Sequence, residues 1–279
     1  YLGFNGFVMM DSGGFYFLKK GRVDVSPDEI LEIEERARPD IGVVLDFPLD
    51  PRNRSSDRKR IEYTMINTNS MLSKASIPMM PVIHGHNIAD LDFSFSMLDD
   101  KQTILVALGS QAGVLYPFRV NKVNKIIDNV LHVRRKFPDS FLHVFGLGSP
   151  RLAPLMFYLG ADSVDAKTWL WKAVRHMIYH NGKIVCLRGD TWSWTPVYDG
   201  KDFRCDCPVC MQHGFNGLIG ESAWKRRAIH NAWQYQKDVE CLRNAIVEKR
   251  VDEYLNSRLN DSPLRPLLEY AKTRMEQSR

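Results

Sequence analysis

The sequence predicts an α/β protein of the (β/α)8 TIM-type barrel class, and two observations carry that prediction. Short apolar runs rich in β-branched residues alternate with helical stretches, which indicates parallel βα units buried on both faces. A polar cluster follows almost every apolar run, as expected at the carboxyl ends of parallel strands. About six such units can be counted, whereas a closed barrel needs eight. We therefore expect either an open sheet or a barrel whose N-terminal units are truncated.

The expected elements follow one another along the chain. Ser26, a proline at the next position and Glu29 form a capping box that opens a helix ending near Arg38. Apolar residues recur at helical spacing over 121–136, and 56–73 is also read as a helix. The expected strands are the apolar runs 7–10, 41–47, 80–83, 104–108, 142–145 and 163–164.

Two domains are expected, a barrel domain over 1–190 and an appendage over 191–279. The stretch from Thr191 to Cys210 is rich in turn-forming residues and contains Trp192, Trp194 and Pro196. From Glu221 to Arg250 the chain is helical and basic. The appendage is therefore predicted to begin with an irregular segment and to end in helices.

The composition sets limits on the class of protein. With 279 residues, 44% hydrophobic and 25% charged, the chain is typical of a globular protein. No apolar run reaches the 18 or so residues of a membrane helix, and no signal peptide is visible at Tyr1. The five cysteines, an odd number, indicate a reducing compartment, so a cytoplasmic protein is expected. A net charge of +5 permits a polyanionic partner without requiring one.

A cysteine cluster predicts a structural zinc site. Cys205, Cys207 and Cys210 are too close in sequence to pair easily as disulfides, but their thiolates can surround one ion. Zinc takes four tetrahedral ligands, and three cysteines with one histidine are a common closed set. His230 is the favoured fourth ligand, because it can reach back from a helix to the cysteine loop. His213, three residues after Cys210, is the alternative.

The polar clusters at the strand ends indicate an active site. Taken singly, each cluster could be an ordinary turn or a satisfied core residue, but one at every strand end favours chemistry. The clusters are Asp11-Ser12-Gly13-Gly14, Asp46, His84-Gly85-His86, Gly109-Ser110-Gln111, Gly146-Leu147-Gly148-Ser149 and Asp165.

In this order, these motifs resemble the guanine transglycosylase family. The resemblance runs from about residue 3 to about residue 240 and rests mainly on the Asp-Ser-Gly-Gly-Phe and cysteine motifs. It implies a zinc-bearing (β/α)8 barrel that exchanges guanine in a polynucleotide for a 7-deazaguanine base such as preQ0. Members of the family often dimerise, so a homodimer is expected.

The resemblance also implies roles for individual residues. Asp165 would be the nucleophile that holds the sugar covalently, and Asp11 the general acid and base. Asp162 competes with Asp165 for the nucleophile role. Asp46 would accept hydrogen bonds from the base. The other residues expected to line the base pocket are Ser12, His84, Gly109, Ser110 and Gln111.

Departures from the family pattern favour a DNA substrate over tRNA. The tRNA enzymes usually carry glutamine where this chain has His84, and a Pro-Thr-Arg segment after the nucleophile. Here Asp165 is followed by a segment containing Lys167, Trp169 and Lys172, whose side chains could contact phosphates and bases. The pattern is closest to the DpdA branch, which inserts 7-deazaguanine into DNA.

Three alternatives remain open. The first is a tRNA-guanine transglycosylase that makes precursors of queuosine or archaeosine. The second is a non-catalytic nucleic-acid-binding subunit that serves an active paralogue. The third is an unrelated barrel hydrolase with a structural zinc ion.

Overall fold

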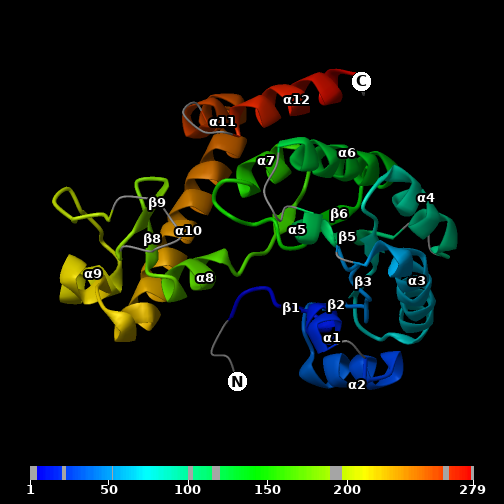
Figure 1. The fold of residues 1–279 in the computed structure, drawn as a ribbon. Helices are drawn as coiled ribbons and strands as arrows, with labels where there is room; N and C mark the ends of the chain where they lie inside the picture. Colours follow the sequence, from blue (N-terminus) through cyan, green and yellow to red (C-terminus); the bar gives the residue numbers. More distant parts are fainter. Residues whose placement is uncertain are drawn as a thin grey trace. The chain divides into compact units, whose positions relative to one another are not determined.

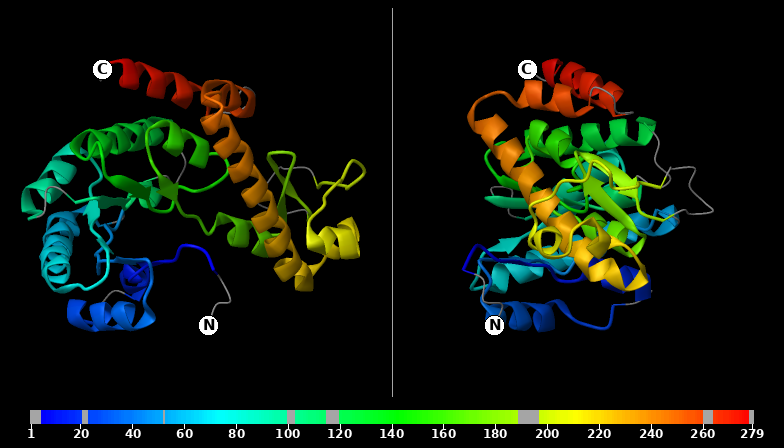
Figure 2. Two further views of the ribbon diagram at one scale, coloured as in Figure 1. Left: turned by 180° about the vertical axis from the view of Figure 1, so that it is seen from behind. Right: turned by 90° about the vertical axis from the view of Figure 1, so that its left-hand side faces the viewer.

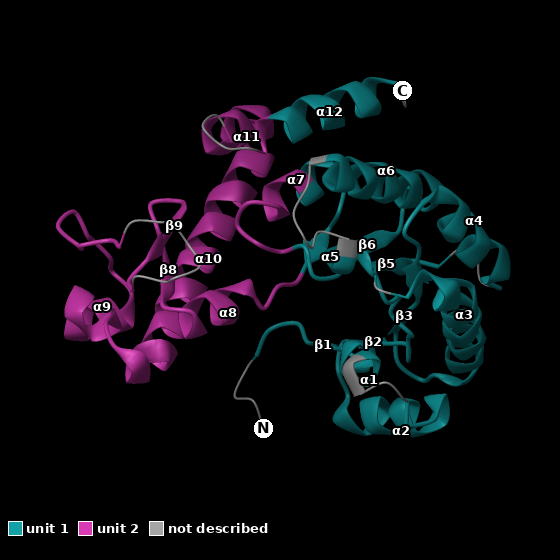
Figure 3. Ribbon diagram, in the orientation of Figure 1, with its two compact units in different colours: residues 1–147, 156–164, 266–279 teal, residues 148–155, 165–265 magenta. Residues whose placement is uncertain are grey.

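The computed structural model describes residues 5–20, 23–51, 53–99, 103–114, 120–188, 197–259 and 264–277. The chain divides into two compact units, drawn in two colours in Figure 3. The first unit holds residues 1–147, 156–164 and 266–279, and the second holds 148–155 and 165–265. The boundary predicted at residue 190 does not coincide with this division. The described part of 191–210 begins at Val197, so the expected Trp192, Trp194 and Pro196 segment lies outside it.

The first unit is built on parallel strands that pair in chain order (Figure 1). The short strands Met79–Met80 and Val82–His84 are counted as one position in the order of parallel strands. Only Pro81, which has no N–H to donate, separates them. The Pro81 carbonyl still accepts a 2.9 Å hydrogen bond from the Ala107 N–H, which keeps the ladder continuous. One sheet has the order β1 (Met9–Met10), β2 (Ile41–Val43), β3 (Met79–Met80), and the other β4 (Val82–His84), β5 (Leu105–Gly109), β6 (Phe141–Val144), β7 (Ser163–Val164).

Helices cover the outer side of these strands, as Figures 1 and 2 show from opposite directions. The capping box at Ser26 is confirmed: the Ser26 hydroxyl accepts from the Glu29 N–H, and the Glu29 carboxylate accepts from the Ser26 N–H at 2.7 Å. The helices are α1 (Gly14–Lys20), α2 (Pro27–Ala37), α3 (Asp57–Lys74), α4 (Ile88–Met97), α5 (Gln111–Val114), α6 (Val120–Lys136) and α7 (Ala153–Tyr158).

The core of the first unit lies between the strands and these helices. The apolar face predicted for 121–136 is confirmed, because its inward residues are solvent-excluded. These residues are Val123, Ile126, Ile127, Val130 and Val133. The C-terminal helix α12 (Arg265–Glu276) adds to this unit, since Tyr270 and Arg274 both donate to the Asp128 carboxylate on α6.

The second unit is organised around a long helix. The buried Arg227 on this helix donates to the carbonyls of Ala173, Leu218 and Gly220, which ties three segments to it. The elements are α8 (Thr168–Val174), the antiparallel hairpin β8 (Met177–His180) and β9 (Lys183–Cys186), α9 (Pro208–His213), the single turns η2 (Phe215–Leu218) and η3 (Glu221–Ala223), α10 (Trp224–Val247) and α11 (Val251–Leu259).

The observed fold agrees with the six βα units counted in the sequence and differs from the expectation in the length of the strands. The parallel strands described here fill six positions, so closure into a (β/α)8 barrel is not reached within the described residues. Several strands are also shorter than predicted, notably β2, which ends at Val43. The apolar run continues to Leu45, where the backbone N–H donates to the Met71 sulfur at 3.2 Å rather than to a neighbouring strand. Among the described helices, none has the length and apolarity that a bilayer span requires.

Candidate base-binding and metal sites

The Asp-Ser-Gly-Gly motif follows β1 and is fixed against the end of β2. The Ser12 hydroxyl donates to the Val44 carbonyl at 3.0 Å, so Ser12 is buried in a structural bond. Gly13 has a φ of 84°, which a residue without a Cβ adopts readily. A Cβ on Gly14 would lie 1.9 Å from Oδ1 of Asp46. The two glycines therefore let α1 begin directly against the Asp46 carboxylate.

Asp46, His84 and Ser110 form one hydrogen-bonded chain across the ends of β2, β4 and β5. His84 Nε2 lies 2.9 Å from Asp46 Oδ2, and Ser110 Oγ lies 2.8 Å from His84 Nδ1. The Leu49 N–H donates to Ser110 Oγ at 2.8 Å, which directs the hydroxyl proton to Nδ1. The imidazole then carries its proton on Nε2 and donates it to Asp46. The structure thus brings together three residues that the sequence placed in one pocket.

Gly109 and Gln111 support this chain. A Cβ on Gly109 would lie 2.4 Å from Cε1 of His84, so only glycine leaves room for the ring. The Gln111 amide donates to the carbonyls of Gly85 and Gly109, and its oxygen accepts from Asn129. Gln111 is fully buried and its polar atoms are engaged, so it holds the loop in shape.

A cavity of about 230 Å³ opens beside Asp46. Its walls come from α1, the segment after β2 and α3, and combine aromatic rings with cationic side chains. Phe47 and Tyr63 lie in ring contact with centroids 5.6 Å apart. Apart from Gly14, the lining residues of α1 and α3 are not among those expected from the sequence, because they lie on helices rather than at the ends of strands. The lining residues are Gly14, Phe17, Leu18, Val23, Asp46, Phe47, Pro48, Ser56, Lys59, Arg60 and Tyr63.

Glu34 is a buried ionisable residue that is not among the site residues expected from the sequence. It lies on the apolar face of α2, is 1% exposed, and accepts a weak hydrogen bond from the Val43 N–H. Burial raises the pKa of Glu34 to about 7, and the nearby negative charge of Asp11 acts in the same direction. A charged residue on the buried stripe of an amphipathic helix was the available signal.

The structure separates the two candidate nucleophiles. Asp162 precedes β7 and is held by Arg134 at 2.6 Å and by the Leu142 N–H at 2.8 Å. It therefore stands at the amino end of the strand, away from the edge where the pocket residues gather. Asp165 comes directly after β7 in the chain, and its side chain is exposed. Its carbonyl accepts from the Gly148 N–H at 2.8 Å.

The segment after Asp165 concentrates positive charge. Lys167 is exposed just before α8, and Trp169 and Lys172 on α8 are partly buried. Burial and the neighbouring Arg175 and Arg151 lower the pKa of Lys172. Cations gathered in this way attract anions such as phosphates.

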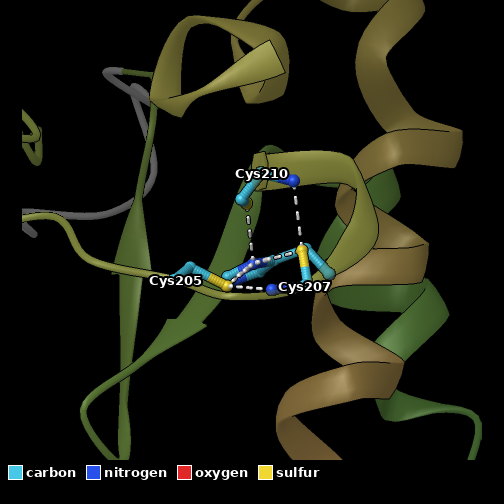
Figure 4. A group of neighbouring side chains, drawn as sticks. Cys205, Cys207 and Cys210 are labelled. Atoms are coloured by element: carbon cyan, nitrogen blue, oxygen red, sulfur yellow. Dashed lines mark hydrogen bonds between the residues drawn. The ribbon is translucent and has the colours of Figure 1, made fainter. Parts of the chain in front are cut away.

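The predicted zinc ligands converge in the second unit. His230 Nδ1 lies 3.3 Å from the sulfur of Cys205, 3.7 Å from that of Cys207 and 3.4 Å from that of Cys210. Ligands bound tetrahedrally to zinc through one nitrogen and one sulfur lie about 3.6 Å apart. Figure 4 shows Cys205 and Cys207 on the loop that leads into α9 and Cys210 on α9 itself. His213, at the end of α9, is exposed and outside the cluster, so His230 is the fourth member.

The surroundings of the cluster suit a cation. His230 Nε2 donates to the Tyr179 carbonyl at 2.8 Å, which leaves the Nδ1 lone pair facing the sulfurs. Without a metal ion, the three thiols do not ionise equally. A hydrogen bond from Cys210 lowers the pKa of Cys205 to about 3, while burial raises the pKa of Cys207. A bound divalent cation would allow all three to be thiolates. The residues present therefore fit a closed structural zinc site.

These features define a class of protein before any relative is considered. Parallel βα units carry a buried carboxylate–imidazole–hydroxyl chain beside a small cavity, and a separate unit carries a Cys₃His ligand set. That combination is typical of an α/β protein with a polar-ligand site and a structural metal cluster.

Comparison with known proteins places the chain within that class. A model of the family described as "Queuine tRNA-ribosyltransferase" matches residues 1–263. The chain belongs to this guanine transglycosylase family, as its motifs predicted.

Individual relatives are distant but cover the chain almost completely. A tRNA-guanine(15) transglycosylase from Sulfolobus acidocaldarius is 24% identical over 97% of this chain and 55% of its own length. Relatives of the same name from Pyrococcus abyssi and Saccharolobus solfataricus are each 26% identical, over 94% and 92% of this chain and 44% and 51% of their own lengths. The chain thus spans about half the length of these curated relatives. None of these comparisons supports the predicted DNA branch.

Proposed function

We propose that the protein exchanges guanine in tRNA for a 7-deazaguanine base. Family membership and relatives named for tRNA favour this function over the DNA reaction that the sequence analysis preferred. The observation that carries the proposal is the Asp46–His84–Ser110 chain beside the cavity. It presents a carboxylate, fixed in orientation, at the carboxyl ends of the strands.

Base recognition follows from that carboxylate. Guanine and its 7-deaza analogues offer two adjacent N–H donors, on N1 and the exocyclic amine, and a carboxylate accepts from both. His84 holds one oxygen of Asp46, while the other oxygen lies on the Gly14 side. The cavity of about 230 Å³ is below the ~300–1,000 Å³ of sites for larger ligands, in keeping with a single base. Phe47 and Tyr63 add aromatic surface.

The proposed exchange proceeds in two displacements. An Asp165 carboxylate oxygen bonds to C1′ as the C1′–N9 bond of guanine breaks, and the departing base takes a proton from Asp11. The incoming base returns a proton to Asp11 as its own nitrogen bonds to C1′, which releases Asp165. Bonds and protons balance over the cycle, as in a retaining glycosidase. The zinc ion, held by the Cys₃His set, would stabilise the second unit and take no part in these steps.

A covalent-trapping assay tests this proposal. Protein is incubated with bulk tRNA, with single-stranded DNA or with double-stranded DNA, each containing guanine, and is then run on a denaturing gel. We expect a shifted band with tRNA that is lost in Asp165→Asn. Asp162→Asn is the matched control, because Asp162 lies at the opposite end of β7, and it should retain the band.

The outcomes separate the alternatives. A band with DNA alone would restore the DNA reaction, which the lysine and tryptophan residues after Asp165 suggested. Trapping lost equally in both aspartate variants, with both folded as judged by circular dichroism, would overturn the assignment of Asp165 as the nucleophile. No band with any substrate, together with tRNA binding, would favour the non-catalytic subunit.

A further inference from the structure

Three polar side chains lie along one face of α10, each four residues from the next. They are Arg227, Asn231 and Tyr235, and residues at this spacing are neighbours on a helix surface. A polar stripe usually faces solvent, yet Arg227 and Asn231 are solvent-excluded. Buried polar groups need hydrogen-bond partners, and Arg227 Nε finds one in the Ala173 carbonyl near the end of α8, at 2.7 Å.

The other two side chains of the stripe bond to the beginning of α8. Asn231 Nδ2 donates to the Trp169 carbonyl at 3.0 Å. The Tyr235 hydroxyl is hydrogen-bonded to the hydroxyl of Thr168, the first residue of α8. Figure 1 shows α8 lying beside the N-terminal part of α10. A helix of seven residues is too short to be stable alone, so these bonds to α10 decide where α8 begins.

Asn231 is itself fixed by strand β8. Its Oδ1 accepts from the Tyr179 N–H at 2.9 Å, and its Nδ2 also donates to the Met177 carbonyl at 3.2 Å. The preceding residue, His230, donates to the Tyr179 carbonyl at 2.8 Å, so consecutive residues of α10 bond both backbone groups of Tyr179. Both ends of the Asn231 amide are engaged, which leaves the side chain one orientation and holds α8 in register with β8.

The beginning of α8 matters because Asp165 comes just before it in the chain. The backbone of Asp165 is held separately by Gly148, whose N–H donates to the Asp165 carbonyl at 2.8 Å. A Cβ on Gly148 would lie 2.7 Å from that carbonyl oxygen, so a glycine is needed for this close approach. The chain is thus fixed at Asp165 by Gly148 and at Thr168 by Tyr235.

We propose that Asn231 and Tyr235 are positioning residues that hold Asp165 in place for its attack on C1′. This inference rests on the proposed function, in which Asp165 forms the bond to the sugar. A nucleophile must lie about 3–3.5 Å from the atom it attacks, and a displacement of about 1 Å can slow a reaction about a hundredfold. The two side chains should therefore affect the covalent step and leave tRNA binding unchanged.

Single-turnover trapping tests the proposal. Full-length chain in excess over tRNA, without an incoming base, is quenched at intervals in denaturant, and the covalent band is quantified. We expect Asn231→Ala and Tyr235→Phe each to slow band formation by about tenfold or more, with tRNA affinity within about twofold of the native value. Tyr198→Phe is the matched control, because its hydroxyl lies in the same unit but donates to Asp202 at 2.6 Å, and it should react at the native rate.

Two results would overturn the proposal. One is a native rate of band formation in Tyr235→Phe. The other is a fall in tRNA affinity as large as the fall in rate, which would mean that the side chains only maintain the fold. Tyr235→Phe keeps the ring, which packs against Tyr179 with centroids 5.0 Å apart, so this variant remains decisive if Asn231→Ala fails to fold.

Failure of the proposed function would look different, because the native protein itself would then form no covalent band. Hydrogen–deuterium exchange still tests the hold on α8 in that case. We expect the amides of 166–174 to exchange faster in Asn231→Ala and Tyr235→Phe than in the native protein, and at the native rate in Tyr198→Phe. Unchanged exchange in Asn231→Ala and Tyr235→Phe would show that α8 is held without these side chains.

Discussion

At Ser110 the backbone has a φ of 67°, a conformation that residues with side chains rarely adopt. The hydroxyl compensates, because it donates to His84 and accepts from Leu49. Strain of about 1–2 kcal/mol is thus retained at a position whose side chain completes the chain to Asp46. Strain held by hydrogen bonds next to a pocket is typical of functional sites.

Two substitutions at Ser110 separate strain from function. Ser110→Gly relieves the backbone and loses hydrogen bonds, so its free energy of unfolding should stay within about 1 kcal/mol of the native value. Ser110→Ala keeps the strain and loses the same bonds, so it should be less stable. Both should slow guanine exchange by about tenfold, because His84 loses its partner. Urea unfolding and exchange kinetics measure the two effects, and native activity in Ser110→Gly would refute the role of the hydroxyl.

Glu34 predicts a pH dependence of stability. Its pKa is about 7 in the folded protein and 4.5 in the unfolded chain, so the folded state binds more protons between these values. The contribution of Glu34 is fully present below pH 4.5 and is lost as the pH rises to about 7. Glu34→Gln, which cannot ionise, should therefore be more stable than the native protein by roughly 3 kcal/mol at pH 8. That advantage should vanish near pH 4.5.

Glu35→Gln is the control for this experiment, with the opposite sign. Hydrogen bonds from Ser76 lower the pKa of the partly exposed Glu35, so its contribution is present at neutral pH and is lost as the pH falls below about 4.5. Urea unfolding at about pH 4 and at pH 8 compares the two variants, because Glu35 loses its contribution only below about pH 4.5. The same pH profile in both would contradict the assignment to burial.

At the scale of elements, sequence motifs predicted the structure correctly where all the interacting residues lie in one short segment. The capping box of α2 is an example, because Ser26 and Glu29 bond to each other. The β8–β9 hairpin is not among the expected strands, although its turn, Asn181-Gly182, is a strong hairpin signal and both residues have positive φ.

The cysteine loop and α9 should depend on metal. We expect Cys207→Ser to lose zinc and to destabilise the protein by more than about 3 kcal/mol, because a closed metal site contributes its binding energy to folding. Cys241→Ser changes an exposed cysteine outside the cluster and should leave both properties unchanged. Plasma emission spectrometry gives the zinc content, and thermal unfolding gives the stability. Full zinc content in Cys207→Ser would refute the ligand assignment.

For the whole molecule, the net charge of +5 is modest, so its distribution matters more than its size. Lys172, Arg151 and Arg175 form a cationic group within the second unit. The proposed tRNA substrate would meet this charge through its phosphates. Affinity should therefore fall as the salt concentration rises.

Lys172→Ala measures the share of that group in binding. Each phosphate contact contributes about one unit to the slope of log affinity against log salt, so the variant should bind tRNA with a slope smaller by ~0.7–0.9. Lys201→Ala is the control, because Lys201 is exposed and paired with Asp199 at 3.0 Å. Filter binding at salt concentrations from about 50 to about 200 mM gives the slope for each variant. An unchanged slope in Lys172→Ala would remove α8 from the nucleic-acid surface.

The sequence by itself determined the parallel βα order, the apolar face of α6 and the membership of the cysteine cluster. These depend on periodicity and on ligand chemistry, which are properties of local sequence. It also named Asp46, His84 and Ser110 as neighbours, because the carboxyl ends of parallel strands share one edge.

Only the tertiary structure decided the rest, since those features depend on contacts between residues far apart in the chain. It chose His230 over His213, bonded Asp162 to Arg134 and to the Leu142 N–H, and showed why Gly14 has no side chain. It also revealed Glu34, whose raised pKa comes from burial. Burial is set by the packing of whole elements, which no local pattern specifies.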